Sequence, residues 1–164
     1  MSNPEATHHF QVTTSFGVVT GWVRDKQLLR LMINADTQPS LPLLPMEEQT
    51  LFKAAIDAIL QGEEPKWLPQ LAPQGSEFQQ LVWRGLLQIP KGKVWSYADL
   101  AKHIGKSAQA SRAVGSACGA NPIALFIPCH RVVRKDGGLG GFAWGLPLKR
   151  HLLRQEGVTL ISDP

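Results

Sequence analysis

Residues 96–118 have the sequence SYADLAKHIGKSAQASRAVGSAC, and they set the expected fold of the second half of the chain. Ser96 is a residue type that caps helix N-termini, which predicts a short helix over residues 97–104. The Gly-Lys-Ser sequence at 105–107 predicts a turn, and a second helix is expected over 108–118. Two helices joined by a short glycine-containing turn are the layout of the helix-turn-helix motif. Many helical proteins contain such a corner, so the layout by itself is weak support for DNA binding.

The first half of the chain predicts a small antiparallel sheet with one helix. Residues 10–34 are rich in β-forming side chains, with strands expected at 16–23 and 27–33 and a hairpin turn at 24–26. Over residues 46–60 the apolar side chains recur at helical spacing, which predicts a helix.

A proline-rich stretch separates the two halves. Residues 63–75 contain three prolines and a glycine, which is typical of a linker between domains. After it, Ser76 is expected to cap a helix, and the second half is mostly helical. The sequence therefore predicts an α/β chain of two domains, a supporting domain over 1–73 and a second domain over 74–164.

The charge is distributed unevenly between the two halves. The 164 residues carry a net charge of +4, which many proteins without a nucleic-acid partner share. From Gln74 onward, twelve Lys and Arg stand against five Asp and Glu, a net charge of +7, whereas the first half has −3. This asymmetry favours a polyanion as the partner of the second half.

The composition argues against a membrane protein and against a disulfide scaffold. No apolar run approaches the ~20 residues that a membrane helix needs, and residues 1–10 lack the basic and apolar regions of a secretory signal. The expected location is therefore the cytoplasm. The only two cysteines, Cys118 and Cys129, are predicted to be free thiols.

The sequence Pro-Cys-His-Arg at residues 128–131 is the strongest candidate for chemistry. It follows the apolar run at 123–127, which is expected to bury it. A thiol beside His and Arg lies in a positive environment that lowers its pKa and favours the nucleophilic thiolate. A free cysteine is, however, most often an inert core residue, and on these residues alone both interpretations of Cys129 stay open. Cys118 is better explained as core.

Two other uses of these side chains are less well supported. A zinc site is disfavoured because Cys118, Cys129 and His130 lack the close paired spacing of zinc ligands, so no metal site is predicted. A thiol protease requires a second, distant histidine to activate the thiol. His103 and His151 are available, but nothing near them favours that role.

A series of short motifs follows in order over residues 75–157. They are Gly75-Ser76-Glu77-Phe78-Gln79, Val82-Trp83, Ile89-Pro90-Lys91-Gly92, Ser96-Tyr97, Leu100-Ala101, Arg112-Ala113-Val114-Gly115, Asn121-Pro122, Ile127-Pro128-Cys129-His130-Arg131-Val132-Val133, Gly145-Leu146, Lys149, Leu152-Leu153 and Glu156-Gly157. In this order they resemble the O6-alkylguanine-DNA alkyltransferase family. The N-terminal 70 residues match that family only in general shape.

The resemblance implies a fold and an activity. The first domain would be a ribonuclease-H-like antiparallel sheet with a helix, and the second a helical winged helix-turn-helix domain. The protein would transfer a methyl or alkyl group from O6 of guanine in DNA to Cys129, and transfer from O4 of thymine stays open. Because a thioether is no leaving group at neutral pH, the transfer would be irreversible and stoichiometric. No cofactor is implied.

The resemblance also implies roles for four catalytic residues. Cys129 would accept the alkyl group, and His130 would act as a general base through a water molecule. Glu156 would hold the imidazole and stabilise its charged form, which is how a weak nucleophile is activated. Asn121 would brace the turn before the active-site segment, although an ordinary Asn-Pro turn explains it equally well.

Contacts with DNA are implied as well. Tyr97 would donate its hydroxyl to N3 of a flipped guanine, and Arg112 would fill the space that the flipped nucleotide leaves. The partner would be double-stranded DNA containing O6-alkylguanine, with the second helix in the minor groove. A monomer is expected, and cooperative binding along DNA stays open. The other implied DNA-binding residues are Ser96, Ala110, Ala113, Gly115 and Lys135.

The loop at residues 140–145 would form a wall of the base pocket. The Ala143 N–H would face O6, and the Val132 carbonyl would accept from the exocyclic amine. Phe142 stands where many members have Tyr, and Trp144 where some have Gly. A bulky Trp144 predicts weaker acceptance of bulky adducts than of methyl.

Two alternatives to alkyl transfer are less consistent with these residues. An alkyltransferase-like protein would bind the lesion without repairing it, but such relatives carry another residue, typically Trp, in place of Cys129. A helix-turn-helix regulator without chemistry would leave the sequence at 128–131 unexplained.

Overall fold

The computed structural model describes residues 5–36 and 38–160, and it has an α/β fold with a four-stranded sheet. The chain divides into two compact units, Met1–Gln74 and Gly75–Pro164. Within the described residues, none of the helices combines the length and the apolar character needed to span a bilayer.

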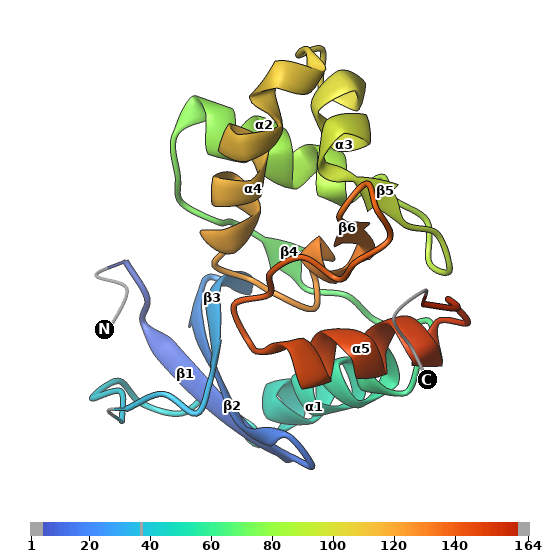
Figure 1. The fold of residues 1–164 in the computed structure, drawn as a ribbon. Coiled ribbons are helices and arrows are strands. Elements are labelled where there is room, and N and C mark those ends of the chain that lie inside the picture. Colours follow the sequence, from blue (N-terminus) through green and yellow to red (C-terminus); the bar gives the residue numbers. More distant parts are fainter. Residues whose placement is uncertain (1–4, 37, 161–164) are drawn as a thin grey trace. The chain divides into compact units, whose positions relative to one another are not determined.

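The first unit contains a sheet with strand order β1-β2-β3-β4 (Figure 1). Strands β1 (His8–Thr14), β2 (Gly17–Arg24) and β3 (Gln27–Ile33) pair antiparallel. The expected turn between β2 and β3 is confirmed, with positive φ angles of 49° at Asp25 and 67° at Lys26. Two successive left-handed residues are the signature of a tight two-residue hairpin.

The fourth strand is a difference from the sequence prediction. Strand β4 (Gln70–Leu71) lies inside the stretch expected to be a linker, and it pairs parallel with β3. The sheet is therefore mixed rather than purely antiparallel. Two residues between prolines are too few to show the alternation by which a strand is recognised in a sequence.

Helix α1 (Met46–Leu60) begins and ends at the predicted residues and packs on β1. The Phe10 and Phe52 rings stack with their centroids 4.2 Å apart. Gly21, on the neighbouring strand, faces the Phe10 ring so closely that a Cβ atom would come within 2.1 Å of it. Only glycine therefore fits at that position, and the aromatic stack forms part of the core of this unit.

The second unit is mostly helical. Its α-helices are α2 (Glu77–Leu86), α3 (Tyr97–His103), α4 (Ser111–Gly119) and α5 (Leu146–Gln155). Two short 3-10 turns accompany them, η1 (Ala108–Ala110) before α4 and η2 (Cys129–Arg131) in the candidate active segment. Residues 108–110, expected as the first turn of the second helix, thus have the tighter 3-10 geometry.

Side-chain caps fix where α2 and α3 begin. The Ser76 hydroxyl accepts from the Gln79 N–H, and the Gln79 side chain accepts in return from the Ser76 N–H. Ser96 and Asp99 form the same reciprocal arrangement at α3. Both predicted caps are confirmed, and each satisfies backbone N–H groups that the helix itself leaves unpaired.

Helices α2, α3 and α4 pack around a common apolar core. The buried Trp83 on α2 donates its indole N–H to the Ala117 carbonyl of α4 over 2.9 Å. Gly85 lets α2 approach α3, because a Cβ there would lie 2.7 Å from the Ile104 side chain. These contacts fix the position of α4, and of the chain segment that follows it, within the second unit.

A small parallel pair of strands positions the active segment. Strand β5 (Trp95–Ser96) pairs with β6 (Val132–Val133). Because α3 follows β5 directly and η2 precedes β6 directly, this pairing brings Tyr97 close to the Cys129 segment. The sequence did not predict the pair, since its partners are about 37 residues apart in the chain and each strand has two residues.

Candidate active site

A cavity of about 180 Å³ opens beside Cys129 in the second unit. Its walls come from the start of α3, from one side of α4, from η2 and from the loop before α5. The lining residues are Tyr97, Gly115, Cys118, Gly119, Cys129, Gly141, Phe142 and Ala143. The glycines on α4 leave open space where side chains would otherwise stand, so a flat group can approach the sulfur.

Cys129 is a buried thiol with only 6% of its surface exposed. Its N–H donates to the Ile127 carbonyl over 2.8 Å, which fixes the start of η2. Burial raises the pKa of Cys129, and the nearby Asn121 and Lys149 side chains lower it only in part. The prediction of a lowered thiol pKa is therefore wrong, because burial outweighs the positive environment.

The histidine and arginine that follow Cys129 both contact Glu156. Nε2 of His130 lies 2.9 Å from Oε2 of Glu156. Arg131 donates from Nε and Nη2 to the two carboxylate oxygens, each over 3.0 Å, and from Nη1 to the Ile89 carbonyl over 2.8 Å. The Glu156 side chain is 2% exposed. The Arg131 guanidinium therefore binds the Glu156 carboxylate and not the Cys129 thiol.

The protonation of this group follows from its geometry. Burial raises the pKa of Glu156, but the hydrogen bonds from His130 and Arg131 outweigh burial and bring it to about 2. An ionised carboxylate only accepts, so Nε2 of His130 carries the proton of that bond. Nδ1 is then the basic atom. It is buried and has no hydrogen-bond partner among the residues that the structure describes.

His130 is held in its neutral form. Burial lowers the pKa of His130, although the bond with Glu156 raises it in part. The Phe142 ring lies edge-on to the imidazole, with the centroids 6.4 Å apart. A neutral imidazole with an unused Nδ1, on the residue that follows a protonated thiol in the chain, is suited to general-base activation.

Asn121 braces the segment between α4 and Cys129. Its Oδ1 accepts from the Ile123 N–H and its Nδ2 donates to the Ile127 carbonyl, both over 2.9 Å. The residue is buried, so both bonds satisfy groups that water does not reach. This geometry also fits an ordinary Asn-Pro turn, and the two roles are compatible.

Tyr97 stands at the start of α3 with its ring against the cavity. Burial raises the pKa of Tyr97, so its hydroxyl keeps its proton. The loop passes close to this hydroxyl, because a Cβ on Gly140 would lie 2.7 Å from Oη, and Gly140 has a positive φ of 73°. Only glycine is suited to that position, so the loop and the tyrosine are fitted to each other.

Comparison with known proteins decides which family has this arrangement. Residues 77–158 match the family described as "6-O-methylguanine DNA methyltransferase, DNA binding domain". The chain belongs to this family.

Relatives and solved structures agree with the family match. The methylated-DNA–protein-cysteine methyltransferase of Methanosarcina mazei is 45% identical over 129 residues, which are 77% of this chain and 81% of that protein. The protein of the same name from Lodderomyces elongisporus is 44% identical over 72% of this chain, and the chain spans 61% of that relative's length. The crystal structure of Mycobacterium tuberculosis OGT in complex with DNA has a TM-score of 0.80 at 34% identity, covering 91% of this chain and 92% of that one.

One residue near this cavity was not predicted as a site residue from the sequence. Lys149 on α5 is fully buried, and its Nζ donates to the Val132 carbonyl over 2.7 Å and to the Gly141 carbonyl over 2.9 Å. Burial lowers the pKa of Lys149 to about 8. The side chain thereby ties the strand after Cys129 to the loop that lines the cavity. The lysine belongs to the motif series over residues 75–157, but its burial has no local sequence signal.

The structure gathers some of the predicted binding residues at the cavity and leaves others outside its lining. Phe142 and Ala143 line it. Val132 is buried outside the lining, with its carbonyl bonded to Lys149, and Trp144 is half-buried in a turn that is also outside the lining.

The predicted DNA-binding residues lie mostly on or near α4. Arg112 and Ala113 are exposed on that helix, and Gly115 lies one turn further along toward the cavity. Ala110 ends the preceding 3-10 turn. The remaining two, Ser96 and Lys135, line a separate groove that Tyr97 borders.

Proposed function

We propose that this protein repairs DNA by direct transfer of a methyl or alkyl group from O6 of guanine to Sγ of Cys129. The observation that carries the proposal is a cavity lined by a thiol whose neighbouring histidine has an unused, buried Nδ1. Curated relatives are named methylated-DNA–protein-cysteine methyltransferases. The reaction class is therefore a single-turnover S-methyl transfer.

The thiol is activated when the substrate arrives. At rest Cys129 is protonated and His130 is neutral, because burial shifts both pKa values in those directions. Nδ1 of His130 takes the thiol proton through a bridging water molecule, and the charged imidazole is stabilised by Glu156 at 2.9 Å. The resulting thiolate attacks the carbon attached to O6. One S–C bond forms and one C–O bond breaks.

The leaving guanine takes the electron pair of the broken bond. Tyr97 donates a hydrogen bond to N3 and the Ala143 N–H faces O6, so the developing negative charge is stabilised within the cavity. The guanine anion then accepts the proton that His130 took from the thiol, and His130 returns to its neutral form. The products are guanine in DNA and S-alkylcysteine. A thioether does not leave at neutral pH, so each protein molecule reacts once.

Tyr97→Phe tests the role of the hydroxyl. We expect methyl transfer to slow by about 10²-fold, because one donor to the developing charge is lost. The ring that lines the cavity is kept, so the thermal unfolding midpoint should change little. Single-turnover rates with methylated duplex measure the effect. A transfer rate equal to that of the unchanged protein would remove Tyr97 from the mechanism.

Binding is proposed to extract the damaged nucleotide from the duplex. The second unit is a winged helix-turn-helix domain that places α4 in the minor groove, with Arg112 filling the space in the base stack. Its net positive charge and the exposed position of Arg112 support this geometry. The protein binds as a monomer.

Arg112→Ala separates base flipping from chemistry. We expect transfer from methylated duplex to be about 100-fold slower. Flipping the nucleotide costs a few kcal/mol, and the variant lacks the Arg112 side chain that fills the vacated space and offsets this cost. Transfer from the free base O6-methylguanine needs no flipping and should be nearly unchanged. Rates with the two substrates, measured in parallel, give the ratio. An equal loss with both would argue against the flipping role.

The two units have different proposed roles. The first, over residues 1–73, is a ribonuclease-H-like domain that supports the second, and residues 74–164 bind DNA and accept the alkyl group. The first unit has a mixed sheet with a covering helix, which is compatible with such a domain. The cytoplasmic location stays a prediction.

Stoichiometry tests the proposed reaction against lesion binding without repair. Increasing amounts of protein are added to duplex containing O6-methylguanine, and the remaining lesion is measured. Direct transfer removes one lesion per protein molecule and then stops. Tight binding with undiminished lesion would identify an alkyltransferase-like protein, and continuing turnover would identify a different reaction.

A further inference from the structure

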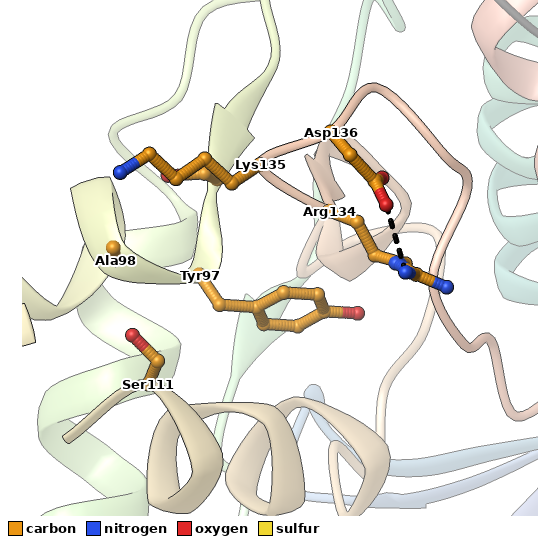
Figure 2. A pocket seen from close by; sticks show the side chains of 7 residues that line it. Tyr97, Ala98, Ser111, Arg134, Lys135 and Asp136 are labelled. Atoms are coloured by element: carbon orange, nitrogen blue, oxygen red, sulfur yellow. Dashed lines mark hydrogen bonds and ion pairs between the residues drawn. The ribbon is translucent and has the colours of Figure 1, made fainter. Parts of the chain in front are cut away.

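A second hollow, a groove of about 380 Å³, shares Tyr97 with the lining of the cysteine cavity (Figure 2). It is lined by Ser96, Tyr97, Ala98, Ser111, Arg134, Lys135 and Asp136. Because Tyr97 lines both spaces, a nucleotide base held beside Cys129 would have its backbone near this groove. Most of its exposed lining is apolar, and two cationic side chains, Arg134 and Lys135, stand among the lining residues.

The charges in the groove are not all available at rest. Figure 2 shows Lys135 extending along the side of the groove formed by Ala98, while Arg134 reaches back to Asp136. Nη2 of Arg134 lies 2.7 Å from Oδ2 of Asp136. One of the two cations is therefore paired with a carboxylate inside the groove itself.

The two partners of this ion pair are held unequally. Oδ1 of Asp136 accepts from the Gly138 N–H over 2.9 Å, so the carboxylate is fixed by the turn that carries it. The backbone of the turn is closed as well, because the Arg134 N–H donates to the Gly138 carbonyl over 2.9 Å. The Arg134 guanidinium has only the ion pair among the described contacts that the structure gives it.

The ion pair is weak enough to exchange. Its side chains are 63% and 61% exposed, and exposed pairs of this kind contribute little to stability. The Arg134–Asp136 pair joins one guanidinium nitrogen to one carboxylate oxygen, whereas a DNA phosphate can bind an arginine through two parallel hydrogen bonds. Asp136 has a second hydrogen bond to its own turn, so it would lose that bond if it moved with the arginine.

We propose that Arg134 leaves Asp136 and binds a DNA phosphate in this groove, and that Asp136 thereby weakens binding to the DNA backbone. The inference rests on the proposed function, since it requires DNA on this face. After the exchange, the fixed carboxylate remains unpaired beside a phosphate, and this repulsion opposes binding. The repulsion therefore weakens binding to undamaged duplex. The protein must dissociate from such duplex again while it searches for a lesion.

The test compares three variants on unmodified duplex at several salt concentrations. Asp136→Asn keeps an acceptor for the Gly138 N–H and removes the charge. Arg134→Gln removes the cation, and the double variant removes both. The pair Lys53–Asp57, 2.7 Å apart on α1 of the other unit, provides a matched control. The control double variant Lys53→Gln with Asp57→Asn changes the same charge types away from the groove.

The proposal predicts a specific pattern. Asp136→Asn should bind about three- to ten-fold more tightly at low salt, because an exposed repulsion is lost. Its dependence of log K on log salt should equal that of the unchanged protein, since the number of phosphates contacted is the same. In the double variant the slope should be smaller by about 0.9, the value for one lost phosphate contact. The Lys53 and Asp57 control should change neither quantity.

Two outcomes would overturn the exchange. If Arg134 stays on Asp136 in the complex, Asp136→Asn should free Arg134 to contact one more phosphate, and the dependence of log K on log salt should become steeper. The double variant should then have the same salt dependence as the unchanged protein. If the groove does not meet DNA, none of the variants should differ. Thermal unfolding checks that each variant is folded. Methyl uptake from the free base O6-methylguanine tests the proposed reaction separately, because that substrate has no phosphate for the groove.

Discussion

Cys129→Ser is expected to bind methylated duplex as tightly as the unchanged protein and to take up no alkyl group. The two side chains have nearly the same size, so the cavity and the η2 turn persist. A serine hydroxyl is a much weaker acid than a thiol, and a neutral His130 cannot generate the alkoxide. Gel-shift titration and methyl uptake from a labelled duplex measure the two properties on the same samples.

The second thiol provides the control. Cys118 lines the same cavity, and burial raises its pKa to about 12, so it does not form a thiolate near neutral pH. Cys118→Ser should therefore still take up one methyl group per molecule, whatever its rate. Uptake by Cys129→Ser would show that another residue accepts the group, and it would end the assignment.

Glu156→Gln should slow methyl transfer by about 10²- to 10⁴-fold, the range that general-base catalysis supplies. The amide keeps the shape of the carboxylate but not its charge, so the imidazolium that forms on His130 is no longer stabilised. The variant should also lose about 3 kcal/mol of unfolding free energy, because the buried carboxylate that forms an ion pair with Arg131 loses its charge. Single-turnover rates and urea unfolding measure the two effects.

Arg131→Gln separates catalysis from stability. This variant also breaks the ion pair with Glu156, but it leaves the hydrogen bond of 2.9 Å between His130 and Glu156. It should lose comparable stability and much less transfer rate than Glu156→Gln. Equal losses of rate in both variants would mean that the carboxylate acts only through folding.

The same carboxylate predicts how stability depends on pH. The hydrogen bonds from His130 and Arg131 bring the pKa of Glu156 to about 2, against an ordinary value of 4.5. A lowered pKa gives stability that is fully present above 4.5 and is lost as pH falls from there toward 2. Unfolding measured at neutral pH and in that acidic range should show this loss in the unchanged protein and a smaller loss in Glu156→Gln.

Much of the local structure follows from local sequence signals. Ser76 and Ser96 form the expected caps, α1 spans the predicted residues, and the turn at Asp25 and Lys26 joins two strands as expected. Strand β4 and the β5–β6 pair were not foreseen, because each strand has only two residues. Pairing between distant segments of that length depends on tertiary packing, which leaves no periodic pattern.

The residues of the candidate site also divide into those that local sequence signals predict and those that they do not. Cys129 and His130 stand out because they are adjacent, whereas Glu156 on its own has the appearance of a surface charge and was assigned through the family resemblance. Lys149 was missed, because lysine is rarely buried and its two carbonyl partners are far apart in the chain. The direction of the Cys129 pKa was mispredicted for a related reason. Neighbouring residue types suggest charge, but only the fold reveals burial.

Peptide mass spectrometry after reaction with duplex containing O6-methylguanine tests the central claim most directly. The protein is digested, and the peptides that contain Cys118 and Cys129 are compared before and after incubation. We predict one methyl group in place of one hydrogen on the Cys129 peptide, in amounts equal to the lesion removed, and an unchanged Cys118 peptide. Loss of the lesion with an unmodified Cys129 peptide would contradict the account.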